Sequence, residues 1–149
     1  MVIYERTPHY YETDQMKIVH HSNYIRWFEE ARVAYLDAVG MRFADQEATG
    51  IVCPVLTVDA KYIQMVRFGD TVEIETRLNL YNGLRYGFSY EVRNKATGKL
   101  CCTGTSTHCF LDPQGNPIKV KRNYLPMHEV LTKYLAEDQK SKPPVERVV

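Results

Sequence analysis

One carboxylate and two imidazoles precede a predicted helix near the start of the chain. Asp14 comes first, and the adjacent His20 and His21 follow after a short mixed run. From Tyr24 onward apolar residues recur every three or four positions, so we expect a helix there. The first N–H groups of a helix are unpaired and lie at the positive end of its dipole. A carboxylate beside such N–H groups is the minimum equipment for splitting an ester-like bond.

The elements that must position these residues can be predicted from local patterns. The helix is expected over Tyr24–Val39, with Ser22 and Asn23 as N-cap candidates and Gly40 at the usual C′ place. Its apolar stripe is unusually broad, which favours burial against a sheet. The members of that stripe are Tyr24, Trp27, Phe28, Ala31, Ala34, Tyr35, Leu36 and Ala38.

The remainder of the chain is dominated by strand patterns. Asn82-Gly83 is a hairpin signal between two of them. The strands are expected at Val2–His9, Ile51–Val66, Thr71–Leu80, Leu84–Asn94 and Lys99–Leu111, with a helical turn at Phe43–Glu47 and a short amphipathic helix at Tyr124–Ala136.

An N-terminal strand, one helix and four strands in a meander predict an α+β fold, a mainly antiparallel sheet wrapped around a central helix. Residues 1–139 are expected to form one domain, and residues 140–149 a flexible tail. The strand near residue 55 is expected to be half-buried, because its apolar and polar residues alternate.

The stretch DQMKIVHHSNYIRWFEEAR, which begins at Asp14, resembles the signature of hot-dog-fold acyl-CoA thioesterases, most closely the 4-hydroxybenzoyl-CoA thioesterase family. The family usually has glycine at the place of Lys17, where glycine would allow a positive φ. The positions in register are Asp14, Ile18, Val19, His21, Asn23 and Tyr24.

The resemblance implies a hot-dog fold and hydrolysis of an acyl- or aryl-CoA thioester to the free acid and CoA. It assigns Asp14 as general base or nucleophile and gives the helix N-terminus at His21 the task of polarising the thioester carbonyl. Tyr24 would line the site, and His20 would have a structural or pocket-wall role. It also implies a homodimer or homotetramer with sites at the protomer interface.

The CoA phosphates would be held by basic residues that follow the last strand, Lys119, Lys121 and Arg122, and by Arg85 beside the hairpin. Exposed lysine and arginine suit phosphate through charge-assisted contacts. CoA is part of the substrate, so no cofactor is expected.

Three other interpretations stay open from the residues alone. Asp14 could be a turn residue that only satisfies local N–H groups, as aspartates in turns often do. The chain could be a non-catalytic hot-dog protein that binds acyl-CoA or a partner, or, with less support, a dehydratase. A metal site is disfavoured, because adjacent histidines seldom converge on one ion and no HxH or HExxH spacing occurs.

Bulk composition narrows the function classes further. The 149 residues carry a net charge of +1 and no basic stripe, which argues against nucleic acid as a partner. Four cysteines lie in apolar runs without a CxxC pair, so we expect reduced, buried thiols in a cytoplasmic protein. We find neither a signal-peptide pattern nor a run of about 20 apolar residues, so no membrane span is expected.

Overall fold

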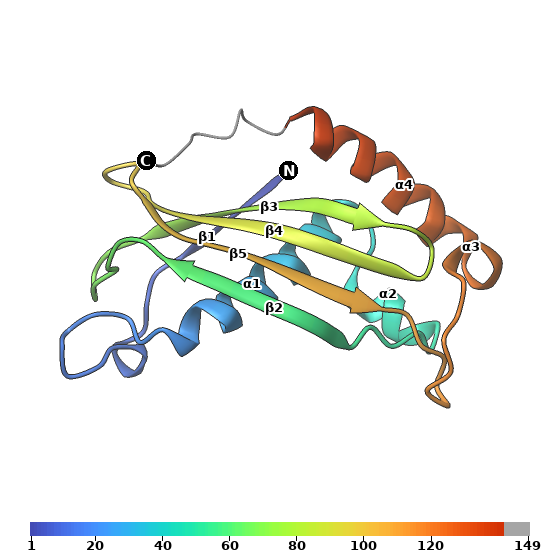
Figure 1. Cartoon of the computed structure of the whole chain (residues 1–149), viewed down its shortest axis with the longest axis horizontal. Coiled ribbons are helices and arrows are strands. Elements are labelled where there is room, and N and C mark those ends of the chain that lie inside the picture. Colours follow the sequence, from blue (N-terminus) through green and yellow to red (C-terminus); the bar gives the residue numbers. More distant parts are fainter. Residues whose placement is uncertain (142–149) are drawn as a thin grey trace.

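The computed structural model describes residues 1–141 as a curved antiparallel sheet wrapped around a central helix (Figure 1). The strands are β1 (Val2–Arg6), β2 (Val55–Tyr62), β3 (Val72–Tyr81), β4 (Arg85–Asn94) and β5 (Leu100–Cys109). The helices are α1 (Ser22–Ala38), α2 (Phe43–Ala48), α3 (Val120–Asn123) and α4 (Leu125–Lys140). The predicted α+β class and wrapped architecture are confirmed.

The order of strands across the sheet is β1-β3-β4-β5-β2. The predicted four-strand meander is therefore wrong, because β2 pairs with β5 at the far edge rather than with β3. Only β3, β4 and β5 are joined as consecutive neighbours. β1 pairs with the first half of β3, from Val72 to Thr76, and α4 packs against β3 (Figure 1).

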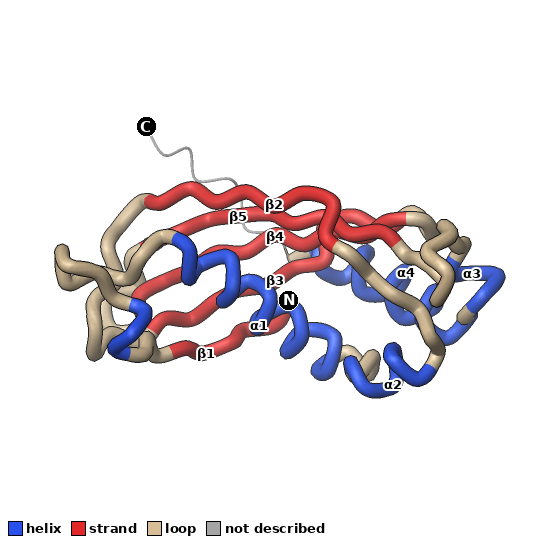
Figure 2. The backbone as a smooth tube through the Cα atoms, turned by 90° about the horizontal axis from the view of Figure 1, so that it is seen from below, coloured by secondary structure: helices blue, strands red, loops and turns tan. Residues whose placement is uncertain are grey.

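Helix α1 lies across the concave face of the sheet (Figure 2). Most of its predicted stripe is buried, with Trp27, Ala31 and Tyr35 fully enclosed, but Ala34 is half-buried and Ala38 near the C-terminal end is exposed. The Phe28 ring stacks on Tyr90 of β4 with centroids 4.4 Å apart. Gly104 of β5 permits this approach, because a Cβ atom there would overlap the Phe28 ring.

The ends of α1 differ in part from the prediction. The helix begins at Ser22 with His21 as N-cap, and no side chain caps it. Ser22 and Asn23 are therefore not N-caps; the Asn23 amide instead donates to the carbonyls of Glu12 and His20, at 2.9 and 3.2 Å. Gly40 does follow the C-cap with a φ of 87°, as expected of a C′ glycine.

Strand β2 is more exposed than its alternation predicted. Seven of its eight residues are exposed, because β2 is an edge strand with a neighbouring strand on one side only. In strand β3 the predicted apolar face is buried from Val72 to Leu78. A register shift against β4 follows Leu78, and Leu80 is exposed.

Helix α4 continues four residues beyond its predicted end at Ala136. Asp138 explains the extension: its buried carboxylate accepts hydrogen bonds from the Leu78 N–H at 2.9 Å and from the Tyr35 hydroxyl. α4 therefore includes Lys140, the first residue of the predicted tail; residues 142–149 of that tail lie outside the described part. No helix within residues 1–141 is long and apolar enough to cross a membrane.

Candidate active site

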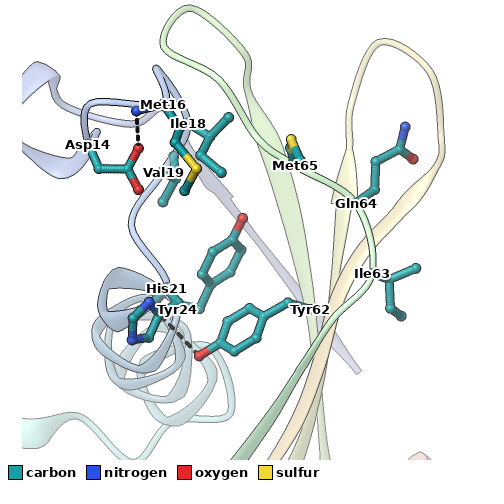
Figure 3. Close-up of a pocket in the computed structure, with 10 residues that line it drawn as sticks. All are labelled: Asp14, Met16, Ile18, Val19, His21, Tyr24, Tyr62, Ile63, Gln64 and Met65. Atoms are coloured by element: carbon teal, nitrogen blue, oxygen red, sulfur yellow. Dashed lines mark hydrogen bonds between the residues drawn. The ribbon is translucent and has the colours of Figure 1, made fainter.

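A cavity of about 410 Å³ opens at the N-terminal end of α1 (Figure 3). Three segments surround it: the loop that begins at Asp14, the first turn of α1, and the segment that ends β2. The sequence prediction placed Asp14, His21 and Tyr24 in one site, and all three line this cavity. The full lining is Asp14, Met16, Ile18, Val19, His21, Tyr24, Tyr62, Ile63, Gln64 and Met65.

The Asp14 loop is a tight turn closed by its own backbone. Asp14 Oδ1 accepts the Met16 N–H at 2.8 Å, and the Asp14 carbonyl accepts the Lys17 N–H at 2.9 Å. Within residues 1–141 no hydrogen bond reaches Asp14 Oδ2. The carboxylate thus satisfies the turn with one oxygen and keeps the other available at the cavity.

Lys17 adopts the conformation that the usual glycine would allow. Its φ is 62°, the only positive value at a non-glycine residue in the described chain. A left-handed conformation costs an L-residue roughly 1–2 kcal/mol. The loop therefore keeps its shape despite the substitution, at a local cost in stability.

The backbone N–H of His21 is the donor left free at the start of α1. Among the described residues it has no acceptor, whereas the next two N–H groups are bonded to His20, Ser22 to its Nδ1 and Asn23 to its carbonyl. The His21 carbonyl accepts the Tyr62 hydroxyl at 3.1 Å (Figure 3). Tyr62 therefore connects the end of β2 to the helix N-terminus and fixes the distance between them.

Aromatic rings form much of the cavity wall. Tyr24 is buried and meets the Tyr62 ring edge to face, with centroids 5.3 Å apart. Burial raises the pKa of the Tyr24 hydroxyl well above its ordinary value, so this side chain stays neutral. Tyr24 thus contributes an uncharged wall.

His20 lies outside the cavity lining. Its Nδ1 accepts the Ser22 N–H at 3.3 Å and lies 2.8 Å from the Ser22 hydroxyl. The ring therefore supports the first turn of α1. This contact supports the structural role expected of His20 and not the pocket-wall role.

The four basic residues expected to bind phosphate lie at the other end of the sheet. Lys119, Lys121 and Arg122 are exposed on or beside α3, and Arg85 is exposed at the start of β4. A hydrogen bond of 3.0 Å from the Val120 N–H to the Gly83 carbonyl brings these two segments together. Figure 1 shows α3 at the opposite end of the molecule from the loop that carries Asp14. Within one chain, the structure does not bring this basic group to the cavity.

No local pattern pointed to Glu12, whose buried side chain links the segments that form the site. Its carboxylate accepts hydrogen bonds from Arg6 at 2.8 Å, from the His9 N–H at 2.7 Å and from the Trp27 indole at 2.8 Å. Its carbonyl accepts the His20 N–H at 2.8 Å. Glu12 therefore joins β1, the Asp14 loop and α1 at one buried point.

Tyr62, Gln64 and Met65 were also missed as site residues. They come from the end of β2 and the segment after it, about 40 residues beyond the helix N-terminus. Their alternation predicts a strand but not what the strand end faces. Only the fold brings this segment opposite Asp14.

The arrangement can polarise a carbonyl and activate water at one place. A carbonyl oxygen could accept the His21 N–H while the free oxygen of Asp14 takes a proton or attacks the carbonyl carbon. In the described chain no group of three or more His, Cys, Asp or Glu side chains is placed to hold a metal ion. A carboxylate and a free N–H at one cavity are the groups that acyl transfer to water uses.

The sequence and the fold both match known thioesterases. The family model of the thioesterase-like superfamily matches residues 8–144. The chain belongs to the thioesterase-like superfamily. A curated relative in this superfamily, named "Putative acyl-CoA thioesterase YneP" from Bacillus subtilis, is 33% identical over 125 residues, covering 83% of this chain and 90% of the relative.

Two solved structures of similar sequence have the same fold. DHNA-CoA thioesterase from Staphylococcus aureus is 31% identical, with a TM-score of 0.88 over 95% of each chain. A hypothetical protein from Thermus thermophilus is 29% identical, with a TM-score of 0.82 over 89% of this chain and 98% of that one. The predicted hot-dog fold is thereby confirmed, and the protein is a thioester hydrolase. The narrower assignment to the 4-hydroxybenzoyl-CoA family is not confirmed.

Proposed function

We propose that this thioesterase hydrolyses an acyl- or aryl-CoA thioester to the free acid and CoA. One observation supports this most directly: the free oxygen of Asp14 and the free N–H of His21 line the same cavity. The curated relative is named for acyl-CoA, and the Staphylococcus aureus structure for DHNA-CoA. The Tyr24 and Tyr62 rings suit a flat or apolar acyl group.

The reaction can follow two routes from the same geometry. With Asp14 as general base, the carboxylate takes a proton from water, and the water oxygen bonds to the thioester carbon. With Asp14 as nucleophile, its oxygen forms a mixed anhydride that water then opens. In both, the His21 N–H donates to the carbonyl oxygen as negative charge develops, the C–S bond breaks, and the sulfur of CoA receives a proton.

The test is Asp14→Asn, assayed on a panel of acyl-CoAs with a free-thiol reagent. Asparagine keeps an oxygen to accept the Met16 N–H, so the turn should survive while the base is lost. A positioned general base contributes about 10²–10⁴-fold in rate. We therefore expect kcat to fall by about that factor or more, with the melting temperature nearly unchanged.

A matched control is Asp112→Asn, because Asp112 Oδ1 accepts the Gln114 N–H at 2.9 Å in a turn of the same kind outside the cavity. It should leave kcat unchanged. Turnover of Asp14→Asn within about threefold of wild type, well short of a general base's contribution, would remove Asp14 from the mechanism. Tight acyl-CoA binding by wild type without thiol release would favour the non-catalytic binding module.

A further inference from the structure

A second cavity, of about 120 Å³, lies between α1 and β2. The two elements run antiparallel: Tyr24 meets Tyr62 at the first cavity, and Arg32 shares the second cavity with Val55. The second cavity therefore continues the line of the first along the same pair of elements. It is lined by Ile25, Phe28, Glu29, Arg32, Val55, Val58 and Ser106.

Arg32 is a half-buried cation with no carboxylate partner in the described chain. One guanidinium nitrogen lies 3.3 Å from Nε2 of His108, a fully buried histidine of β5. A guanidinium can only donate, so Nε2 is the acceptor in this contact. The Tyr90 hydroxyl is a second polar neighbour of Arg32: burial raises the pKa of Tyr90, and the charge of Arg32 and a hydrogen bond to it oppose that rise. No carboxylate among residues 1–141 forms an ion pair with the other N–H groups of Arg32.

The polar groups beneath Arg32 are already paired with one another. The Tyr90 hydroxyl lies 2.7 Å from the Ser106 hydroxyl, which lies 2.8 Å from His108 Nε2. Burial, and then the charge of Arg32, lower the pKa of His108 to about 4, so it is neutral near pH 7. None of these three neutral groups can balance the positive charge of Arg32, and the Glu29 carboxylate that lines the same cavity forms no ion pair with it.

We propose that Arg32 binds an oxygen atom at the distal end of the acyl group. This rests on the proposed function, since it extends the acyl group from the first cavity into the second. Arg32 lies 11 residues beyond His21, about 16 Å along the helix axis at 1.5 Å per residue, a span that a long extended acyl chain can cover. The oxygen would belong to a hydroxyl or a carboxylate. Glu29 is exposed at the rim of this cavity, and its negative charge would weaken the binding of a carboxylate more than the binding of a hydroxyl.

The experiment compares tetradecanoyl-CoA, omega-hydroxytetradecanoyl-CoA and tetradecanedioyl-CoA, which differ only at the distal carbon and are long enough to reach Arg32 from His21. In wild type we expect one of the two oxygenated substrates to exceed tetradecanoyl-CoA in kcat/KM by about 10- to 100-fold, the contribution of a hydrogen bond to a charged group. Arg32→Met should bring that ratio close to one, and Arg32→Lys should retain part of it. The hydroxyl and carboxylate substrates show which oxygen is bound.

Arg26→Met is the matched control, because Arg26 is an exposed arginine of α1 outside both cavities. It should keep the wild-type ratio. Titration of wild type with thioether analogues of the three compounds measures the same preference without hydrolysis, so a loss of the proposed reaction would not hide it. Equal affinity for all three analogues, or a preference that survives in Arg32→Met, would overturn the proposal.

Discussion

Glu12 shows how one buried residue can set the geometry of a site it does not line. It is 3% exposed and accepts four side-chain or backbone donors, two of them from Arg6. In Glu12→Gln an amide would face these donors, and Arg6 would keep only Glu30 as its ion-pair partner. Breaking a buried ion pair costs about 3–5 kcal/mol, so thermal unfolding should show a melting temperature lower by about 10 °C.

The pH dependence of that loss follows from the Glu12 pKa. Burial raises it, but hydrogen bonds from the His9 N–H, Trp27 and Arg6 outweigh burial and hold it below the ordinary value. When the pKa of a carboxyl group is lower in the folded protein than in the unfolded chain, the group stabilises the fold fully at pH values above its unfolded pKa. This contribution to the free energy of unfolding is lost as the pH falls through the folded pKa. The stability gap between wild type and Glu12→Gln should therefore be full at pH 7 and shrink below about pH 4.5. A gap that stays constant down to pH 3 would contradict this assignment.

Among the elements, α1 and β5 can approach closely because Gly104 of β5 has no side chain. A Cβ atom at Gly104 would overlap the Phe28 ring and lie 2.5 Å from the Asp59 carbonyl oxygen of β2. Phe28 has little room to move, since it stacks on Tyr90. Gly104→Ala should therefore reduce the free energy of unfolding by about 3 kcal/mol, the upper part of the overpacking range, and lower kcat by displacing the helix that carries His21.

A double-mutant cycle with Phe28→Leu separates the two overlaps. A smaller side chain at position 28 should recover part of the cost of Gly104→Ala, giving a coupling of about 1 kcal/mol in denaturant unfolding. Strict additivity would show that the helix does not press on β5 at this glycine.

The whole molecule leaves the outer edge of β2 without a neighbouring strand in the described chain. Val55, Leu56, Val58 and Tyr62 on this strand are each more than 40% exposed. An exposed apolar edge favours pairing with another strand, so we expect a homodimer, alone or within a tetramer, with two β2 strands side by side. A two-fold axis normal to the sheet makes those strands antiparallel. The basic end of one protomer would then lie beside the cavity of its partner.

This arrangement predicts that each active site uses two chains. We expect changing Lys119, Lys121 and Arg122 together to alanine to raise KM with little change in kcat, because these contacts would be made far from the reacting carbon. Refolding this variant with Asp14→Asn should create one intact site in each mixed dimer and restore the wild-type KM at part of the wild-type rate. Mixed dimers that keep the raised KM would place the phosphate contacts within one chain, and sedimentation of a monomer at micromolar concentration would exclude the dimer.

The sequence by itself determined the elements and the centre of the site. The three- and four-residue spacing of α1 and the alternation of β3 depend on which faces are buried, and that information is local in the chain. The run from Asp14 to Tyr24 is also local, so the loop and the helix N-terminus could be recognised together. Lys17 shows the limit of such a pattern, because the fold holds it in the conformation expected of glycine.

Only the tertiary structure decided which distant segments meet. An alternating strand pattern is the same whichever strand lies next to it, so the sequence could not place β2 beside β5 at the sheet edge. That placement exposes β2 and brings Tyr62 to His21, and the crossing of α1 over β5 brings Arg32 to His108. It also separates the basic residues near α3 from Asp14, which their positions in the sequence did not reveal. These contacts depend on pairing between segments far apart in the chain, for which local periodicity carries no information.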